Sequence, residues 1–547
     1  MDRTPVNLSR FVSAPVLRQW LSDGAEIALL DVREAGQFGE GHPFFAVPLP
    51  YSRLELEVGH LVPRRDTRVA LVDAADGVAE RAATRLANLG YTQVFILQGG
   101  APGWAAAGYV LFQGVNLPSK TFGELVEHAY ATPHLSAQDL HALQQTGEPL
   151  VLLDGRTFEE HRKMTIPGAV SVPNGELALR WRALVPNAST PVVVHCAGRT
   201  RSIIGAQILR SLGIANPVIA LENGTQGWAL EGLKLEHGSL RRSAEALPAH
   251  PDDQTAAARE AKAAGVQELS AAQAQAWLLD DHRTTYVLDV RSAEEFARGS
   301  LAGARHAPGG QLLQATDQTI GVRNSRVILL DDEGVRAPVA AAWLRRLGFE
   351  TALVQGGVRA KLDVPVQPVT GLAPVAPVPE VNHGQLPAWV ARQAPLLIDV
   401  QPSMAYRRQH ARGAFWSVRP RLVADVRQRG RQDQPILLFA PDAAVAQIAA
   451  VELHEAGWRD VRWTRVEDWF AAGLRVESTP ALPADADAID YLFFVHDRHE
   501  GNLEAARQYL AWETGLIAQC APDELAVFRL PEVPGAGVAA VAAVAPH

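Results

Sequence analysis

The sequence predicts an α/β protein made of four tandem repeats, each with a central and mainly parallel sheet. A strand, a loop and a helix that closes on glycine recur four times along the 547 residues, at Val69–Gly90, Val192–Gly213, Val327–Gly348 and Ile436–Gly457. Each repeat also starts with a short apolar strand that ends in aspartate, at positions 31, 154, 289 and 399. Apolar strands that alternate with amphipathic helices are typical of layered α/β domains. Since the repeats are roughly a hundred residues long or longer, they are predicted to be whole domains rather than turns of a solenoid.

Composition limits the classes of function. Hydrophobic residues make up 47% of the chain, enough for several buried cores, and the net charge of −9 argues against a nucleic-acid-binding surface. Met1–Arg10 is polar and contains proline, so we expect no signal peptide. The chain contains no uninterrupted apolar run of about 18–20 residues, so no membrane span is predicted. The two cysteines lie far apart, which disfavours a disulfide framework and fits a reducing cytoplasm.

One of these cysteines lies where a thiol can be activated. The apolar strand Val192–His195 runs directly into Cys196, and the helical stretch Ile203–Leu212 follows shortly after. A thiolate between a strand and a helix faces backbone N–H groups and the positive end of the helix dipole, which stabilise an anion. Arg199 and Arg201 add two permanent positive charges in the same turn. The segment therefore predicts a cysteine nucleophile for an anionic or persulfidic partner.

The length of this loop narrows the chemistry. Four residues separate Cys196 from Arg201, one fewer than a cysteine phosphatase loop needs to wrap a tetrahedral phosphate. So small a ring of amides suits a single sulfur atom better. The loop resembles the active-site loop of rhodanese-type sulfurtransferases, which holds a cysteine persulfide. The resemblance extends over residues 135–238, with matching segments at Leu152–Arg156, Phe158–His161, Ile166–Val170 and Glu222–Trp228.

The resemblance implies four rhodanese-like domains and a small α-rich C-terminal extension. The implied domain boundaries are 1–115, 116–240, 263–371 and 380–480, with a linker between the two halves of the chain at 241–262 and the extension at 481–547. Pairs of domains are also expected to pack face to face. Thr165 departs from the family, which often has histidine there, and we expect this to affect packing more than chemistry.

The hypothesis for the second domain is sulfur transfer through a Cys196 persulfide. Thiosulfate or a persulfide is the expected donor, cyanide or a cellular thiol is the expected acceptor, and neither a metal nor another cofactor is expected. Loop amides are expected to stabilise the thiolate and the persulfide, with Gly198 at positive φ and Arg199 turned outward to the donor. Arg201 is expected to support the loop or to bind the same anion. The predicted substrate-binding residues are Ala197, Gly198, Arg199, Thr200, Arg201 and Ser202.

The other three repeats are predicted to be inert. Alignment on the closing glycines places Asp73, Asp331 and Ala440 at the position of Cys196, and none of these side chains can form a persulfide. These domains are therefore interpreted as structural or as docking sites for a protein partner.

Residues around the nucleophile have simpler interpretations. Asp154 and Arg156 are predicted to form a supporting buried ion pair, because the pair recurs in two repeats that have no thiol. Glu176 and Arg180 are weaker candidates for the mouth of the pocket, and Lys120 is a weaker candidate for the donor site. His195 is expected to point away from Cys196 by strand alternation, so it is assigned no role as a base.

The region after the fourth repeat carries two ambiguous features. His496, Asp497, His499 and Glu500 are of metal-ligating types, but they are better interpreted as a polar capping turn, with Asn502 or Asp497 as the helix cap. Cys520 is interpreted as a small buried side chain rather than a resolving thiol.

Two other classes of function stay open. The chain could be a non-enzymatic persulfide carrier or interaction scaffold, in which Cys196 is loaded by another protein and the inert domains dock partners. It could instead be a small-anion reductase or a phosphatase, although the loop length and the lack of a nearby second cysteine argue against both. No nucleic-acid or membrane partner is expected.

Overall fold

The four predicted repeats are four sheets with one strand order. The computed structural model describes residues 10–244, 248–365, 377–496 and 501–531. The first three sheets have the orders β1-β5-β4-β2-β3, β6-β10-β9-β7-β8 and β11-β15-β14-β12-β13. The fourth has the order β20-β19-β16-β18, and a parallel bridge from Glu380 to Trp463 of β20 takes the place of the outermost strand. The α/β class and the repeated, mainly parallel sheets are thus confirmed.

The first and fourth repeats contain the following elements. The strands of the first are β1 (Arg10–Val12), β2 (Ile27–Asp31), β3 (Val47–Pro48), β4 (Arg68–Val72) and β5 (Val94–Leu97), and its helices are α1 (Ala14–Trp20), α2 (Ala35–Glu40), α3 (Leu54–Leu61), α4 (Val78–Asn88) and α5 (Gly100–Ala106). The strands of the fourth are β16 (Leu396–Asp399), β18 (Phe415–Trp416), β19 (Ile436–Phe439) and β20 (Val461–Thr464), with a separate antiparallel pair of β17 (His410–Ala411) and β21 (Val476–Glu477). Its helices are α17 (Leu386–Gln393), α18 (Ser403–Arg408), α19 (Arg419–Arg429), α20 (Ala443–Glu455) and α21 (Val466–Ala471).

The second and third repeats have the same alternation of strands and helices between their first and last strands. The strands of the second are β6 (His134–Leu135), β7 (Val151–Asp154), β8 (Val170–Ser171), β9 (Val192–His195) and β10 (Val218–Leu221), and its helices are α6 (Leu117–Tyr130), α7 (Ala137–Thr146), α8 (Phe158–Lys163), α9 (Leu177–Leu184), α10 (Thr200–Leu212) and α11 (Gly224–Leu230). The strands of the third are β11 (Gln267–Leu269), β12 (Thr285–Asp289), β13 (Arg305–His306), β14 (Arg326–Leu330) and β15 (Glu350–Val354), and its helices are α13 (Ala271–Leu279), α14 (Ala293–Arg298), α15 (Gly309–Gln314) and α16 (Arg336–Arg346).

The C-terminal extension is helical, as expected. Its helices are α22 (Phe493–His496), α23 (Leu503–Thr514), α24 (Leu516–Gln519) and α25 (Pro522–Leu525). Among the helices of the described residues, none has the length and hydrophobicity needed to cross a membrane.

The repeats pack in two pairs, and one pair joins the first and last repeats of the chain. One compact unit contains Ala28–Val115 and Pro368–Phe493, which are the first and fourth repeats. The other contains Asn116–Gln367 and the chain from Phe494 onward, which are the second and third repeats with the end of the extension. The expectation of a linker between two halves of the chain is therefore wrong, because the two repeats it joins belong to one unit.

That predicted linker contains a packed helix. Helix α12 (Pro251–Ala263) lies against α16 of the third repeat and against α9 and α10 of the second. Arg182 of α9 pairs with Asp253 of α12 at 2.8 Å, and Arg259 of α12 donates to the Leu212 carbonyl at the end of α10. The segment stabilises the pair of repeats rather than spacing them apart.

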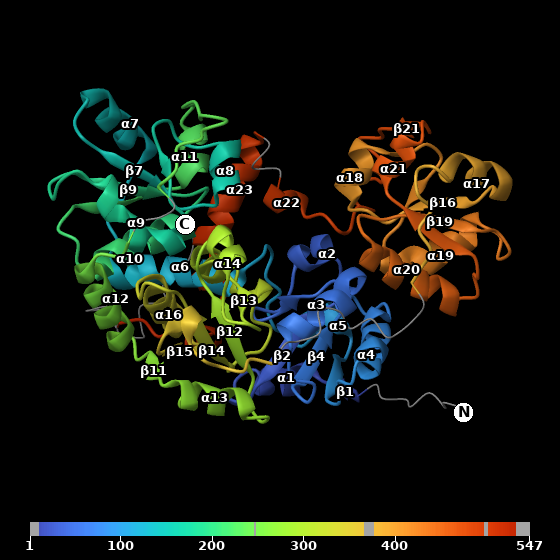
Figure 1. Ribbon diagram of the computed structural model, residues 1–547, viewed down its shortest axis with the longest axis horizontal. Helices are drawn as coiled ribbons and strands as arrows, with labels where there is room; N and C mark the ends of the chain where they lie inside the picture. Colours follow the sequence, from blue (N-terminus) through green and yellow to red (C-terminus); the bar gives the residue numbers. More distant parts are fainter. Residues whose placement is uncertain (1–9, 245–247, 366–376, 497–500, 532–547) are drawn as a thin grey trace. The chain divides into compact units, whose positions relative to one another are not determined.

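Both faces of the second sheet are covered by helices. On one face Leu152 of β7 and Val193 of β9 pack with Leu140 of α7 and Trp228 of α11. Figure 1 shows α7 and α11 on one side of these strands and α9 and α10 on the other. Gly205 brings α10 against β9, since a Cβ atom there would lie 2.9 Å from Val194 Cγ1 and 2.6 Å from Asn174 Oδ1. This close approach fixes the first turn of α10, where the cysteine loop ends.

The variant Gly205→Ala tests this packing. Alanine favours a helix, but overpacking costs more, so we expect the free energy of unfolding to fall by about 1–2 kcal/mol. Urea unfolding of the full chain measures the change. Ser211→Ala, also on α10, is the control and should change stability by less than about 0.5 kcal/mol. An unchanged or higher midpoint for Gly205→Ala would show that the helix has room to move.

Candidate active site

Cys196 lies between β9 and α10, as the sequence predicts, and is 2% exposed. Ser202, in the first turn of α10, donates a hydrogen bond from Oγ to Cys196 Sγ at 3.1 Å. Helix α11 anchors the loop, because the Thr225 N–H donates a hydrogen bond to the Cys196 carbonyl at 2.9 Å. Gly224 is required here: its φ is +50°, and a Cβ atom would lie 2.2 Å from the Cys196 carbonyl oxygen. Backbone and hydroxyl groups therefore position the thiol.

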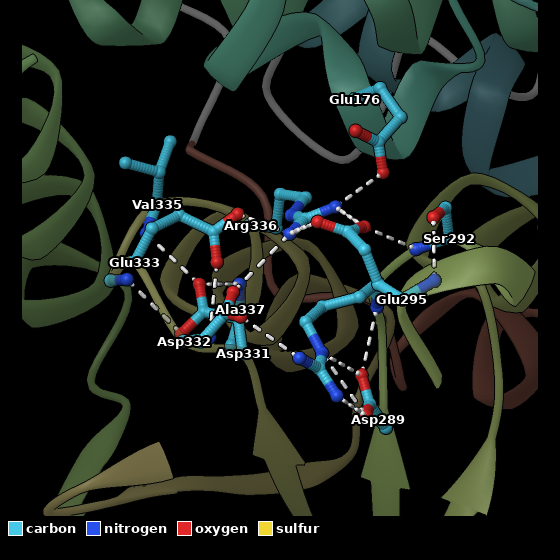
Figure 2. A network of polar contacts seen from close by, with 12 residues as sticks. Glu176, Asp289, Ser292, Glu295, Asp331, Asp332, Glu333, Val335, Arg336 and Ala337 are labelled. Carbon is cyan, nitrogen blue, oxygen red and sulfur yellow. Dashed lines mark hydrogen bonds and ion pairs between the residues drawn. The ribbon is translucent and has the colours of Figure 1, made fainter. Parts of the chain in front are cut away.

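The matching loop of the third repeat shows where its amides point. The carboxylate of Asp331 accepts hydrogen bonds from the N–H groups of Val335 at 3.0 Å and Ala337 at 2.9 Å on Oδ2, and from Gly334 at 3.2 Å on Oδ1 (Figure 2). The Val358 N–H donates to the Asp331 carbonyl, just as the Thr225 N–H donates to that of Cys196. The loop amides thus converge on the side chain at its first position.

The first repeat has the same arrangement. Asp73 accepts from the N–H groups of Ala75 at 2.9 Å and Ala79 at 3.1 Å, and its carbonyl accepts from Ala101. In the fourth repeat, which has Ala440 at this position, Asp442 caps α20 through the Val445 N–H. In three of the four repeats an aspartate therefore accepts hydrogen bonds from amides at the start of this helix.

Arg199 does not point outward, and that expectation is wrong. Its guanidinium is buried and forms a bidentate ion pair with Glu124 of α6, with Nε to Oε1 at 2.9 Å, and a further ion pair with Glu127. Burial raises the pKa of Glu124 to about 7, although Arg199 opposes the shift. The charge of Arg199 is thus already compensated by α6.

Arg201 joins the loop to α8. Its Nη1 and Nη2 atoms donate to Glu160 at 2.8 and 2.7 Å. Burial disfavours the charge of Glu160, but Arg201 outweighs it and lowers the pKa of this carboxyl to about 2. Arg336 and Glu295 form the same pair in the third repeat (Figure 2), which indicates a supporting role for this position.

Gly198 also differs from expectation, because its φ is not positive. Glycine is needed at this position because a side chain would have no room. A Cβ atom on Gly198 would lie 2.9 Å from Glu513 Oε2 and 3.5 Å from Gln226 Nε2. Helices α23 and α11 therefore cover the loop at Gly198.

Glu513 is a site residue that the sequence analysis missed. It is fully buried on α23, and its Oε1 atom accepts from Thr200 Oγ1 at 2.7 Å and from Lys120 Nζ at 2.8 Å. Lys120, a candidate from the sequence, therefore lies beside the loop but pairs with this carboxylate. Glu513 is 313 residues from Thr200, and nothing in the local sequence of an amphipathic helix indicates such a contact.

Asp154 and Arg156 form the predicted ion pair. Arg156 donates to both carboxylate oxygens, at 2.9 and 2.7 Å, and also to the Met164 carbonyl. Arg33 and Arg291 repeat these contacts with Asp31 and Asp289 in the first and third repeats. The pair anchors the crossover after the strand in each of these repeats.

The hydrogen-bond contacts of His195 lie with the Cys196 carbonyl and with Thr165. Its ring lies behind the loop, with Nδ1 3.4 Å from the Cys196 carbonyl and Nε2 3.4 Å from Thr165 Oγ1. Burial lowers the pKa of His195 to about 4, so the ring is neutral at pH 7. Thr165 donates to Asp154 at 2.9 Å and completes the polar contacts of that carboxylate.

Glu176 and Arg180 lie at a contact between domains. Arg180 donates to Glu176 at 3.0 Å, and Arg336 of the third repeat donates to the other Glu176 oxygen at 2.9 Å (Figure 2). Glu295, Asp332 and Glu333 gather around the same Arg336 and are occupied by ion pairs. These residues connect the second and third repeats.

The features after the fourth repeat have mixed outcomes. Asn502 caps α23 through the Ala505 N–H, as expected. Asp497, His499 and Glu500 lie outside the described residues. Neither cysteine is in a disulfide, and Cys520 is half-buried, with its thiol donating to the Leu516 carbonyl at 3.3 Å.

Comparison with known proteins agrees with this architecture. The model of the Rhodanese-like domain matches residues 13–107, 136–231 and 270–361, together just over half of the chain. The chain therefore belongs to the rhodanese-like family. The fourth repeat shares the strand order of the three matched segments.

One solved structure resembles the chain over nearly its full length. The crystal structure of thiosulfate sulfurtransferase from Pseudomonas aeruginosa is 39% identical and covers 96% of this chain and 100% of that one, with a TM-score of 0.87. Among curated proteins, "Putative sulfur carrier protein YrkF" of Bacillus subtilis is 32% identical over 102 residues, and "Uncharacterized protein YibN" of Escherichia coli is 30% identical over 90 residues. These matches cover 19% and 16% of this chain, and the chain spans 54% and 63% of those two relatives.

The Arg201–Glu160 pair leads to a pH-dependent prediction. The folded-state pKa of Glu160 lies near 2, below its ordinary value of 4.5, so the pair stabilises the fold above pH 4.5 and this contribution is lost as the pH falls toward 2. We expect Glu160→Gln to be about 1 kcal/mol less stable than the parent at neutral pH, since Glu160 is one-third exposed and screened. The difference, measured by urea unfolding, should shrink below pH 4.5. Glu159→Gln, at an exposed position of the same helix, is the control, and a difference independent of pH would contradict the assignment.

Proposed function

We propose that the chain is a sulfurtransferase that carries sulfane sulfur on Cys196. Thiosulfate or a persulfide is the donor, and a thiophilic acceptor such as cyanide or a cellular thiol removes the sulfur. The catalytic residue is Cys196, and the amides and hydroxyls of Ala197–Ser202 bind the sulfur. Asp154 and Arg156 support the strand end behind the loop.

The proposed reaction has two steps. The Cys196 thiolate attacks the outer sulfur of thiosulfate, the S–S bond of the donor breaks, and sulfite leaves with the bonding electron pair. The resulting persulfide then transfers its outer sulfur to the acceptor and regenerates the thiolate. Negative charge resides on sulfur beside the loop throughout, so fixed N–H and O–H donors lower the energy of each state.

The observation that carries this proposal is the convergence of loop amides in the third repeat. The amides that bind the Asp331 carboxylate are those of the third, fourth and sixth residues after it. The corresponding residues after Cys196 are Arg199, Thr200 and Ser202. A loop that binds a carboxylate through these amides in one repeat is suited to a thiolate or persulfide in another.

A non-enzymatic carrier is the second candidate. It is favoured by the likeness of a 102-residue segment to a relative named as a sulfur carrier protein. The two candidates differ in turnover: an enzyme accepts sulfur from a small donor repeatedly, whereas a carrier is loaded once and waits for a protein partner. The inert repeats would serve as docking domains in either case, and a reducing cytoplasm would keep both thiols available.

Replacement of the two cysteines tests the proposal. We expect Cys196→Ala to abolish thiosulfate–cyanide sulfur transfer and Cys520→Ala to retain it, because Cys520 lies at the C-terminal end of α24, outside the cysteine loop. Mass spectrometry of the Cys196 peptide should show one added sulfur atom after incubation with thiosulfate. Loading without multiple turnover would favour the carrier, and a protein that neither loads nor turns over would contradict both candidates.

Arg199 is proposed to offset the charge of two glutamates beside the donor. In Arg199→Ala, Glu124 and Glu127 lose their cation, so the KM for thiosulfate should rise about tenfold, equivalent to ~1.4 kcal/mol. The double variant Arg199→Ala/Glu124→Gln removes one of the carboxylates and should recover part of the loss. Steady-state kinetics measure both, and thermal melting checks folding. An unchanged KM in Arg199→Ala would remove Arg199 from the donor site.

A further inference from the structure

Helix α23 brings a carboxylate onto the cysteine loop. Glu513 Oε1 binds the hydroxyl of Thr200, the first residue of α10, and Oε2 lies 2.9 Å from the position of a Cβ on Gly198. Tyr509, one turn earlier on α23, approaches the same point through Cε1 at 3.7 Å. A segment from the end of the chain therefore forms one wall of the space around Cys196.

The charges beside the loop are compensated and slightly negative. Lys120 pairs with Glu513, Arg201 with Glu160, and Arg199 with Glu124. Glu127 is a second carboxylate on Arg199, so within the described part of the chain these carboxylates outnumber the cations they bind. A doubly charged anion that approaches the loop meets no uncompensated cation among these residues, and like charges in a partly desolvated site repel strongly.

A buried amide at the same wall indicates that the space receives a ligand. Gln226 is 5% exposed, and neither Oε1 nor Nε2 of its side chain has a hydrogen-bond partner among the described residues. Its Nε2 atom lies 3.5 Å from the position of a Cβ on Gly198, beside Glu513. A buried amide without partners is costly unless a bound group satisfies it, so a ligand with hydrogen-bonding oxygen or sulfur atoms fits here.

We propose that Glu513 makes this site select sulfur donors of low negative charge over dianionic ones. The inference rests on the proposed sulfurtransferase function and narrows its donor. Glu513 neutralises Lys120, which would otherwise attract an anion, and places its own charge against the loop. Donors with at most one negative charge, such as a thiosulfonate or the persulfide of a small neutral thiol, avoid most of this repulsion.

Two donors of nearly equal shape react with Cys196 in the same way but differ in charge, so a comparison of them isolates the effect of donor charge. Methanethiosulfonate carries one negative charge, and thiosulfate carries two, with an oxygen in place of the methyl group. In each case the Cys196 thiolate forms a bond to the outer sulfur, the S–S bond of the donor breaks, and methanesulfinate or sulfite leaves with the electron pair. The ratio of kcat/KM for the two donors therefore reports on charge selection, and the fraction of active protein cancels.

Glu513→Gln is the decisive variant, because it keeps an oxygen for Thr200 and Lys120 and removes only the charge. We expect the ratio of kcat/KM for thiosulfate to that for methanethiosulfonate to rise at least tenfold, equivalent to ~1.4 kcal/mol. Glu504→Gln, at an exposed position on the same helix, is the matched control and should leave the ratio unchanged. High salt should reduce the difference between Glu513→Gln and the parent.

Other outcomes overturn the inference. An unchanged ratio in Glu513→Gln contradicts charge selection, and an equal rise for both donors assigns α23 the role of a steric cover instead. Either result leaves the sulfurtransferase function in place if both donors add a sulfur atom to Cys196. Failure of both donors to load Cys196 in the parent protein overturns the proposed function and this inference with it.

Discussion

The structure depends on how the first amides of the helix after the central strand are satisfied. Helix N-termini leave backbone N–H groups without intrahelical acceptors, and when they are buried they need an acceptor from elsewhere. Asp331 and Asp73 supply a carboxylate to these amides in the third and first repeats. Asp442 does so for the fourth as an N-cap. In the second repeat Cys196 occupies this position, so the proposed difference between the reactive domain and the other repeats depends mainly on one side chain.

A second constraint is the cost of burying the aspartate at the end of the preceding strand. In the fourth repeat Gln401 replaces the arginine, and burial raises the pKa of Asp399 to about 7. In the second repeat burial acts in the same direction, but the neighbouring His195 and Arg156 and the surrounding hydrogen bonds outweigh it and hold the pKa of Asp154 below its usual range. In the first repeat burial keeps the pKa of Asp31 raised even though Arg33 binds it, so the arginine alone does not decide the charge of this aspartate. What the pairs share is structural: the arginine donates both to the aspartate and to a backbone carbonyl of the crossover.

Local patterns along the chain could be predicted from the sequence, and contacts between distant segments could not. The strand that ends in Asp154, the loop at Cys196 and the closing glycine of α10 are local patterns with a direct physical meaning. The ion pair of Arg199 with Glu124 spans 75 residues, and the bond from Thr200 to Glu513 spans 313. Both depend on how helices pack, and a charged residue in a loop is equally compatible with facing solvent. The association of the second repeat with the third was missed for the same reason, because it depends on surfaces such as that of α12.

The aspartates Asp73 and Asp331 also bear on what the first and third repeats can do. A loop whose amides already bind an internal carboxylate has no free donors for a substrate anion, and the buried charge of Asp331 would repel one. In such a loop the internal carboxylate takes the place that a ligand would occupy. The first and third repeats are therefore better suited to packing and partner contact than to a second, weaker sulfur-transfer activity, which concentrates the proposed chemistry on Cys196.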